Sequence, residues 1–173
     1  MADGNITKKA LAESLKALMK EKDFKKINVG EICEACGMNR KSFYYHFKDK
    51  YDLVNWIYDT EFIKKMYETT FETSVDFLYE MCNYFYINRN FYRQALKITG
   101  QNCFAEHFRE LITPILTVRV NEVFPANSDG FYIDFFADAL ICSLERWLLS
   151  KNTTPPQEFA EKLRSLIKTV FKK

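Results

Sequence analysis

Residues 28 to 50 read "NVGEICEACGMNRKSFYYHFKDK", and this stretch decides how the first part of the chain folds. Asn28 and Asn39 are residue types that favour the N-cap of a helix. Gly37 lies between them and suits the left-handed residue that follows a helix end. The pattern therefore predicts two short helices joined by a tight turn, the second running from about residue 40 to 47.

A longer helix is expected before this pair. From Thr7, a plausible N-cap, apolar residues follow a helical period to Met19 with lysines opposite, which predicts a helix over about 7–22. A packing helix followed by two short helices is the order of a helix-turn-helix. The sequence therefore predicts this motif within the first fifty residues.

The second helix of the pair has two different faces. At 100° per residue, Phe43 and Phe47 share one face and would pack inward. The polar and aromatic residues that face or flank the other side are Arg40, Lys41, Ser42, Tyr44, Tyr45 and His46. Such side chains can bind guanine edges, phosphates and thymine methyl groups, as a recognition helix must. The alternative is an ordinary amphipathic helix whose aromatic residues are partly buried and whose basic residues form a solvated patch.

Charge is distributed unevenly along the 173 residues. Of the 25 Lys and Arg and 23 Asp and Glu, 11 basic and 7 acidic residues fall within positions 1–50. That region carries +4 and the remainder −2, which agrees with the total of +2. The first region is therefore expected to meet a polyanion. Charged residues interrupt every apolar segment, so we expect a cytoplasmic protein without a membrane partner.

The rest of the chain also predicts helices. Only 5 Gly and 4 Pro interrupt it, and no segment has the pattern of a strand. The expected helices span about 50–71, 74–87, 91–99, 104–124, 131–150 and 155–171. Pro114 predicts a kink or a local break near residues 110–114. The expected fold is all-α, with a three-helix helix-turn-helix domain over 1–50 and a helical bundle over 51–173.

The cysteines and histidines suggest no catalytic or metal site. "CEAC" at 33–36 has no second pair of ligands at zinc spacing, so Cys33 and Cys36 are expected to be small core residues. Two histidines, no Gly-rich phosphate loop and no paired ligand cluster argue against an enzyme. No cofactor and no metal are expected.

The stretch "INVGEICEACGMNRKSFYYHFKDKYDLV" resembles the helix-turn-helix of the TetR/AcrR family of transcriptional regulators. The matching positions are Asn28, Val29, Ile32, Gly37, Met38, Ser42, Phe43, Tyr44, Tyr45, His46, Phe47 and Lys50. Asn28 replaces the family's usual Thr, and Cys33 and Cys36 stand where alanines are common. The resemblance implies base and phosphate contacts at Arg40, Lys41, Ser42, Tyr44 and His46, and phosphate contacts at Asn28, Tyr45 and Lys50. Lys50 also opens a predicted helix, where backbone N–H groups favour an anion.

The C-terminal part resembles regulators related to those of dihydroxyacetone kinase operons, mainly through its "GQN", His107 and "RW" spacing. This resemblance implies a homodimer and a helical regulatory domain with an unidentified effector. Aromatic residues that could line an effector pocket are Trp56, Phe62, Met66, Tyr84, Phe85, Phe104 and Phe108. Apolar residues of the last two helices, such as Leu144, Trp147, Leu148, Leu163 and Leu166, predict a dimer interface.

The prediction is therefore a dimeric DNA-binding regulator, a repressor released by an effector on the C-terminal domain, with a near-palindromic operator. The alternative is an activator or repressor controlled by a protein coactivator. A continuous internal cavity would favour a small molecule, and a filled core would favour a protein partner.

Overall fold

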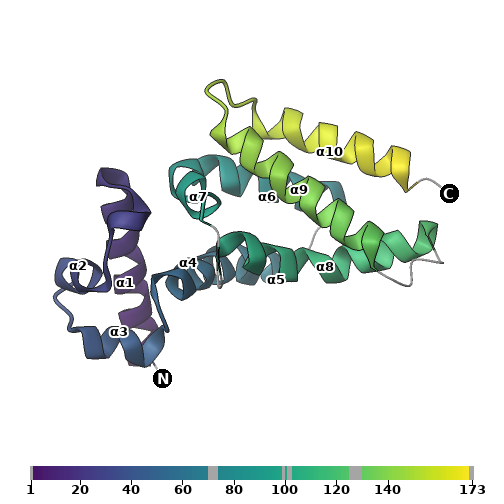
Figure 1. Cartoon of the computed structure of the whole chain (residues 1–173). Helices are drawn as coiled ribbons and strands as arrows, with labels where there is room; N and C mark the ends of the chain where they lie inside the picture. The colour runs from purple at the N-terminus through teal and green to yellow at the C-terminus, as the bar shows by residue number, and fades with distance from the viewer. Residues whose placement is uncertain (1, 70–73, 99, 101–102, 125–129, 172–173) are drawn as a thin grey trace. The chain divides into compact units, whose positions relative to one another are not determined.

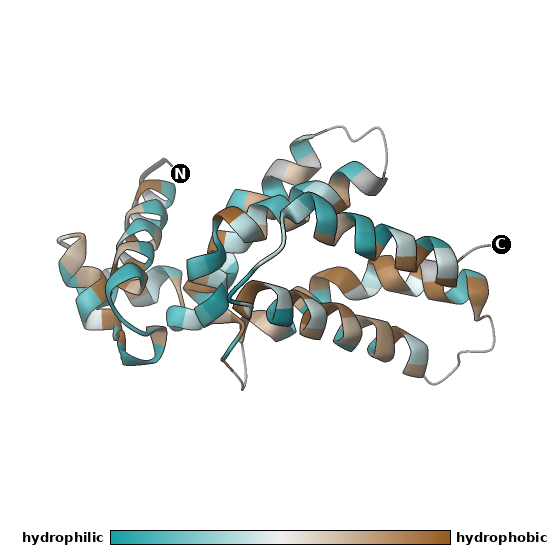
Figure 2. Cartoon of the chain, turned by 90° about the horizontal axis from the view of Figure 1, so that it is seen from above, coloured by the Kyte–Doolittle hydropathy of each residue, from teal (hydrophilic) through white to brown (hydrophobic). Residues whose placement is uncertain are grey.

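A computed structural model describes residues 2–69, 74–98, 100, 103–124 and 130–171 (Figure 1). These residues form helices and connecting turns, and no strand occurs among them. The predicted all-α fold is confirmed. Hydrophilic and hydrophobic residues are mixed around the helices (Figure 2). Accordingly, the described helices include none that is long and apolar enough to span a membrane.

The chain divides into two compact units. Unit 1 comprises residues 1–68 and 90–104, and unit 2 comprises 69–89 and 105–173. A segment from the second half of the sequence therefore belongs to the same unit as the first helices. The functional boundary near residue 50 stays a prediction, since one compact unit can hold parts of two functional domains.

Unit 1 begins with the predicted helix-turn-helix. Its elements are α1 (Ala2–Glu21), η1 (Phe24–Lys26), α2 (Val29–Ala35), α3 (Arg40–His46), α4 (Lys50–Tyr58), η2 (Asp59–Ile63), α5 (Lys64–Glu68) and most of α7 (Arg89–Ala95). The N-cap assigned to Thr7 was wrong: α1 begins at Ala2, so Thr7 lies inside the helix. Leu11, Leu15 and Ile32 are completely buried, which joins α1 and α2 through one core.

The helix predicted over 50–71 is interrupted. α4 ends at Tyr58, one π-helical turn forms η2, and α5 continues to Glu68. Tyr58 and Phe62 stack across this turn, with ring centroids 5.3 Å apart. Both rings are about 1% exposed, so the π-turn lies in the core of unit 1.

Unit 2 is built from four long helices. These are α6 (Ser74–Ile87), α8 (Phe104–Val123, whose first residue belongs to unit 1), α9 (Phe131–Leu149) and α10 (Pro156–Val170). α8 continues through Pro114 without the predicted local break. The Thr113 hydroxyl donates a hydrogen bond to the Arg109 carbonyl at 2.8 Å, one residue before the proline.

Part of the expected dimer surface lies inside unit 2. Leu144 and Leu148 are completely buried, and Trp147 is 6% exposed. The Trp147 ring stacks on Phe159 at 4.3 Å, and its Nε1 donates to the Thr154 carbonyl at 3.0 Å. These residues pack α9 against α10 within the chain and are not free for a partner.

Candidate nucleic-acid interface

The first helix of the helix-turn-helix is fixed by its cap. The Asn28 side chain accepts a hydrogen bond from the Glu31 N–H at 3.1 Å, and Glu31 accepts from the Asn28 N–H at 2.9 Å. This reciprocal pair is a capping box, which satisfies two backbone donors at the start of α2. Asn28 is therefore confirmed as the N-cap of α2. Its predicted phosphate contact stays a prediction.

The turn and the second helix follow the sequence prediction closely. Gly37 has φ 68°, the left-handed conformation that its position requires. The Asn39 side chain then caps α3 by accepting from the Ser42 N–H at 2.8 Å. Because both helix ends have side-chain or glycine caps, the angle between α2 and α3 is set locally.

Two phenylalanines orient α3. Phe43 is completely buried and Phe47 is 3% exposed, with their ring centroids 5.7 Å apart. On the outer side, Tyr44 is 57% exposed and Tyr45 is 84% exposed. Two large aromatic side chains are therefore available on this side of α3 for contact with a partner. The sequence-predicted division between a buried and a free face is therefore present.

The other predicted contact residues lie on the same surface. Arg40 and Lys41 are exposed, and Ser42 and His46 are half-buried. The Arg40 guanidinium lies against Gly30, in the first turn of α2. All six of the side chains predicted for the outer face of the recognition helix are thus exposed or half-buried, and none is part of the core.

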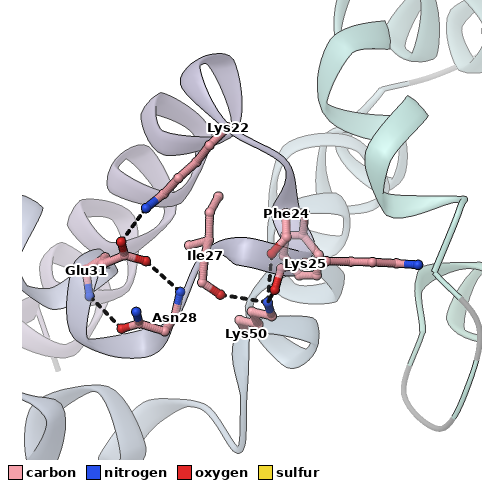
Figure 3. Close-up of polar contacts among 7 residues, drawn as sticks. All are labelled: Lys22, Phe24, Lys25, Ile27, Asn28, Glu31 and Lys50. Carbon is pink, nitrogen blue, oxygen red and sulfur yellow. Dashed lines mark hydrogen bonds and ion pairs between the residues drawn. The ribbon is translucent and has the colours of Figure 1, made fainter.

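Lys50 has a different environment from the one that the sequence suggested. Its Nζ donates to the carbonyls of Phe24 and Ile27, each at 2.7 Å, and to Lys25 at 3.3 Å (Figure 3). It also lies 4.5 Å from the centroid of the Phe24 ring. An ammonium group has three N–H donors. All three are directed at carbonyls in residues 22–27, which connect α1 to α2. Lys50 therefore holds this connector in place.

Two charged groups next to this connector, Lys50 and Glu31, have shifted pKa values. Burial lowers the pKa of Lys50, while Asp23 and Glu31 act in the opposite direction. The hydrogen bond from Lys22 and the Asn28 N–H lower the pKa of Glu31 below its usual 4.5. Lys22 and Glu31 form an ion pair across the connector (Figure 3). Three elements are thereby tied together: the end of α1, the start of α2 and the start of α4.

Sequence reasoning missed a hollow beside the recognition helix. It has a volume of about 730 Å³, and its walls include Lys8, Tyr45, His46 and Trp56. Lys8 lies 5.9 Å from the Trp56 ring centroid. Trp56, predicted for an effector pocket, therefore borders the recognition helix. The sequence pattern places the lysines of α1 opposite its apolar face, but it does not show which of them lies next to α3.

Of the two cysteines of "CEAC", which were both expected in the core, Cys33 is buried, whereas Cys36 is the C-cap of α2 and is half-buried. Cys33 is 2% exposed, and the Cys36 thiol donates to the Ile32 and Cys33 carbonyls, each at 3.4 Å. Burial raises the pKa of Cys33, which keeps its thiol protonated. Over the described residues, no group of three His, Cys, Asp or Glu is placed to hold a metal.

Most of the predicted effector-pocket residues belong to the packed core. Phe62, Met66, Phe85, Phe104 and Phe108 are between 0% and 8% exposed. Within unit 2, Phe85 contacts Phe108 with centroids 5.5 Å apart, and Tyr84 contacts Phe85 at 6.0 Å. A role of these residues in effector binding stays a prediction.

A different part of unit 2 is hollow. A pocket of about 300 Å³ lies between α6, α8, α9 and α10, and its lining residues are Phe77, Leu78, Met81, Ile112, Ile115, Leu116, Leu140, Ile167, Lys168 and Phe171. Its walls are almost wholly apolar, with Lys168 as the charged residue. Spaced apolar residues of four helices form it, so no short sequence motif could have indicated it.

A capped helix pair whose second helix exposes basic and aromatic residues, on a chain whose described elements are all helices, is typical of a DNA-binding transcriptional regulator. Comparison with known proteins agrees with this class. Residues 11–57 match the family described as bacterial regulatory proteins, tetR family. Residues 72–169, more than half of the chain, match the transcriptional regulator C-terminal region of this group. The chain belongs to the tetR family.

Individual relatives are more distant. The dhaKLM operon transcriptional activator DhaS of Lactococcus lactis is 32% identical over 57 residues, which is 33% of this chain and 30% of that protein. The match thus spans less than a third of the relative. A structure of the dihydroxyacetone kinase operon activator DhaS has a TM-score of 0.68 at 20% identity, covering 96% of this chain and 97% of that one.

Other solved structures share the fold. A TetR transcriptional regulator from Streptococcus agalactiae has a TM-score of 0.74 at 20% identity, covering 99% of this chain and 97% of that one. NalD, the secondary repressor of the MexAB-OprM multidrug efflux pump in Pseudomonas aeruginosa, has a TM-score of 0.62 at 18% identity, covering 98% of this chain and 97% of that one. At these identities the likeness shows the fold alone. The predicted family and C-terminal resemblance are confirmed.

Proposed function

We propose that the chain is a repressor that binds a near-palindromic operator as a homodimer and is released by an effector acting on the C-terminal region. The observation that carries the DNA-binding part is the two-sided α3, with Phe43 buried and Tyr45 84% exposed. Such a helix can enter a major groove only with its outer face. Because its partner is DNA, we place the protein in the cytoplasm, and the proposal includes no catalytic activity.

The proposed contacts follow the geometry of α3. Arg40, Lys41 and Ser42 lie in its first turn, and a major-groove helix presents its N-terminal residues to base edges. Tyr44 and His46 complete this surface. Asn28 and Tyr45 are proposed to contact phosphates. Two copies of α3 in a homodimer would be spaced by one DNA turn, about 34 to 36 Å.

An exposed apolar face supports the homodimer. On α9, Phe131 and Phe135 are 60% and 56% exposed and lie one helical turn apart. On α10, Leu166 is 55% exposed and Ile167 is 39% exposed. Apolar residues in such number on two adjacent helices are typical of a surface that a second copy covers.

The pocket of unit 2 supports a small-molecule effector. Its volume of about 300 Å³ is at the lower end of the range for ligand sites, roughly 300 to 1,000 Å³. An apolar lining with a single lysine favours a compact apolar molecule that carries a negative group. Such a ligand would contact α6, α8, α9 and α10 at once, so its binding would change how these helices pack.

A protein effector is the second candidate. The exposed aromatic residues Phe131, Tyr132 and Phe135 form a surface that a partner protein could cover instead of a second copy. In that case the chain would be an activator or a repressor whose signal comes from a coactivator. A monomer in solution that binds DNA only with cell extract would favour this candidate.

A mobility-shift assay on DNA upstream of the gene and its neighbours tests the proposal. We expect a retarded complex with two copies of the chain per duplex, and its loss when a small apolar anion is added. Failure to shift any of these fragments, together with failure to enrich any duplex from a random-sequence pool, would contradict DNA binding. Persistence of the complex with every anion tested would contradict release by such a ligand.

A further inference from the structure

Gln94 of α7 contacts the DNA-binding helices directly. Its Nε2 donates to the carbonyl of Met19, and its Oε1 accepts from the N–H of Phe24, both at 2.7 Å. These partners are 75 and 70 positions away in the sequence. Gln94 lies in the matched C-terminal region, whereas Met19 and Phe24 lie in the matched N-terminal region. All three belong to unit 1.

The two backbone groups that Gln94 binds are ones that a helix leaves without a partner. Met19 is in the last turn of α1, where carbonyls have no intrahelical donor, and Phe24 is the first residue of η1. Met19 is 4% exposed and Phe24 is 1% exposed. Water therefore cannot readily replace Gln94, and moving its side chain away leaves two polar groups unsatisfied.

The same connector is also held by Lys50 of α4. Phe24 is the shared residue: its N–H donates to Gln94, and its carbonyl accepts from Lys50 at 2.7 Å. α7 is itself packed on α4, since Tyr92 is completely buried and its ring lies 6.0 Å from that of Tyr58. The connector is thus fixed by two side chains whose helices contact each other.

The connector leads directly into the helix-turn-helix. Ile27 ends it, and Asn28 then caps α2. A displacement of Phe24 therefore moves the N-terminus of α2, and α3 follows because α2 and α3 share the core around Ile32 and Phe43. The orientation of the recognition helix depends on where the connector is held.

We propose that Gln94 is a positioning residue through which the C-terminal region holds the helix-turn-helix in its DNA-binding arrangement. A movement of α7 is transmitted to α2 and α3 through Met19 and Phe24. This inference rests on the proposed DNA-binding function. It assigns no DNA contact to Gln94, so its loss changes the affinity for DNA without changing the number of phosphate contacts.

The first test replaces Gln94 with alanine in the full-length chain. The probe is a labelled duplex that the wild-type protein has selected from a random-sequence pool. Gln94→Ala is expected to bind it about tenfold more weakly, a change of about 1.4 kcal/mol. The slope of log affinity against log salt stays at the wild-type value, because no phosphate contact is removed. Amide exchange at Phe24 becomes faster.

The second test uses a variant in which the solution pH determines whether the bond to the Met19 carbonyl can form. In Gln94→Glu, a carboxylate still accepts from the Phe24 N–H but cannot donate to the Met19 carbonyl. A protonated carboxyl group does both, as glutamine does. Because the partly buried Met19 carbonyl disfavours the carboxylate, the pKa of this glutamate should lie above the ordinary value of about 4.3. The affinity of Gln94→Glu relative to wild type, each measured at the same pH, is therefore expected to rise severalfold from about pH 8 to about pH 4.5.

Gln157 supplies the matched control. It is an exposed glutamine in unit 2 whose Nε2 donates to the Tyr79 hydroxyl at 2.9 Å. Gln157→Glu is expected to keep a constant affinity relative to wild type over the same pH range. If Gln94→Ala does not fold, the pH dependence of Gln94→Glu alone tests the positioning role.

The outcomes separate this inference from the proposed function. If the wild-type protein selects no duplex, the proposed function fails. If it selects one, and the affinity of Gln94→Glu divided by that of wild type does not change with pH, the positioning role is wrong. An altered salt slope in Gln94→Ala would also overturn it, because that would indicate a lost phosphate contact.

Discussion

The Arg40 side chain occupies the space that a side chain at Gly30 would need. A Cβ atom added to Gly30 would lie 2.6 Å from Nη2 of Arg40 and 3.0 Å from its Nε. It would also lie 2.9 Å from Oδ1 of Asn28, the cap of α2. Gly30 is in a helix, so its role is to leave room for the guanidinium, and the first helix of the motif thereby sets the position of a recognition-helix residue.

Replacing Gly30 with alanine should separate stability from DNA binding. Alanine favours a helix over glycine by roughly 0.5–1 kcal/mol, which offsets disturbance of the Asn28 cap. We expect Gly30→Ala to unfold within a few degrees of wild type but to bind a selected duplex about three- to tenfold more weakly, because Arg40 must move. Thermal unfolding and fluorescence anisotropy measure the two effects. Wild-type affinity in Gly30→Ala would show that the position of Arg40 against Gly30 is not needed.

Lys50→Ala distinguishes a clamp on the connector from a contact with phosphate. Loss of the bonds to the Phe24, Lys25 and Ile27 carbonyls should cost about 1–3 kcal/mol, which lowers the melting temperature by several degrees in a chain of this size. The salt slope of DNA binding should stay unchanged. A slope reduced by about 0.9 with normal stability would instead support the phosphate contact that the sequence suggested. Lys41→Ala, on the outer face, is the control expected to reduce the slope.

Local sequence signals predicted the helix-turn-helix because each helix end and the buried face of α3 are determined by residues only a few positions apart. Asn28, Gly37 and Asn39 set helix ends through neighbours three positions away or less, and the i, i+4 pair of Phe43 and Phe47 sets the buried face. The segment from 28 to 47 could therefore be predicted almost residue by residue.

Contacts between distant residues could not be predicted in this way. Lys50 looked like a surface charge at a helix start, and the sequence does not show that the Phe24 and Ile27 carbonyls lie within its reach. Gln94 had no sequence signal at all. Trp147 was predicted to face a partner because its apolar spacing cannot distinguish packing on α10 from packing on a second copy. Tertiary packing decides all three.

The ion pair of Lys22 and Glu31 should make stability depend on acid pH. The folded-state pKa of Glu31 lies below its ordinary value, so its contribution is present above about pH 4.5 and is lost as pH falls through the lower folded value. Glu31→Gln keeps the capping box but removes the charge. We expect the variant to melt below wild type at neutral pH, and the difference to shrink towards about pH 3.

Melting curves of both proteins between about pH 7 and about pH 3 measure this difference. Glu34→Gln is the control, since Glu34 is exposed on the same helix and forms no ion pair among the described residues. A gap between Glu31→Gln and wild type that stays constant with pH would show that the charge of Glu31 does not stabilise the fold.

The exposed face of α9 predicts how the chain assembles. Phe135→Glu places a charge on the exposed apolar face of α9, one helical turn from Phe131. If two copies bury this surface, a carboxylate there is desolvated without a partner, which costs several kcal/mol. We therefore expect sedimentation to show a dimer for wild type and a monomer for Phe135→Glu at the same micromolar concentration, with an unchanged helical content by circular dichroism.

DNA binding connects this assembly to the proposed function. A near-palindromic duplex is held by two recognition helices, and separating the copies should weaken binding by 100-fold or more because the effective concentration of the second helix is lost. Lys151→Glu, at the exposed turn after α9, changes the charge by two units away from the surface and should remain dimeric. If Phe135→Glu is still a dimer, the interface lies on another surface of the chain. A monomeric wild type would favour a partner protein on this face.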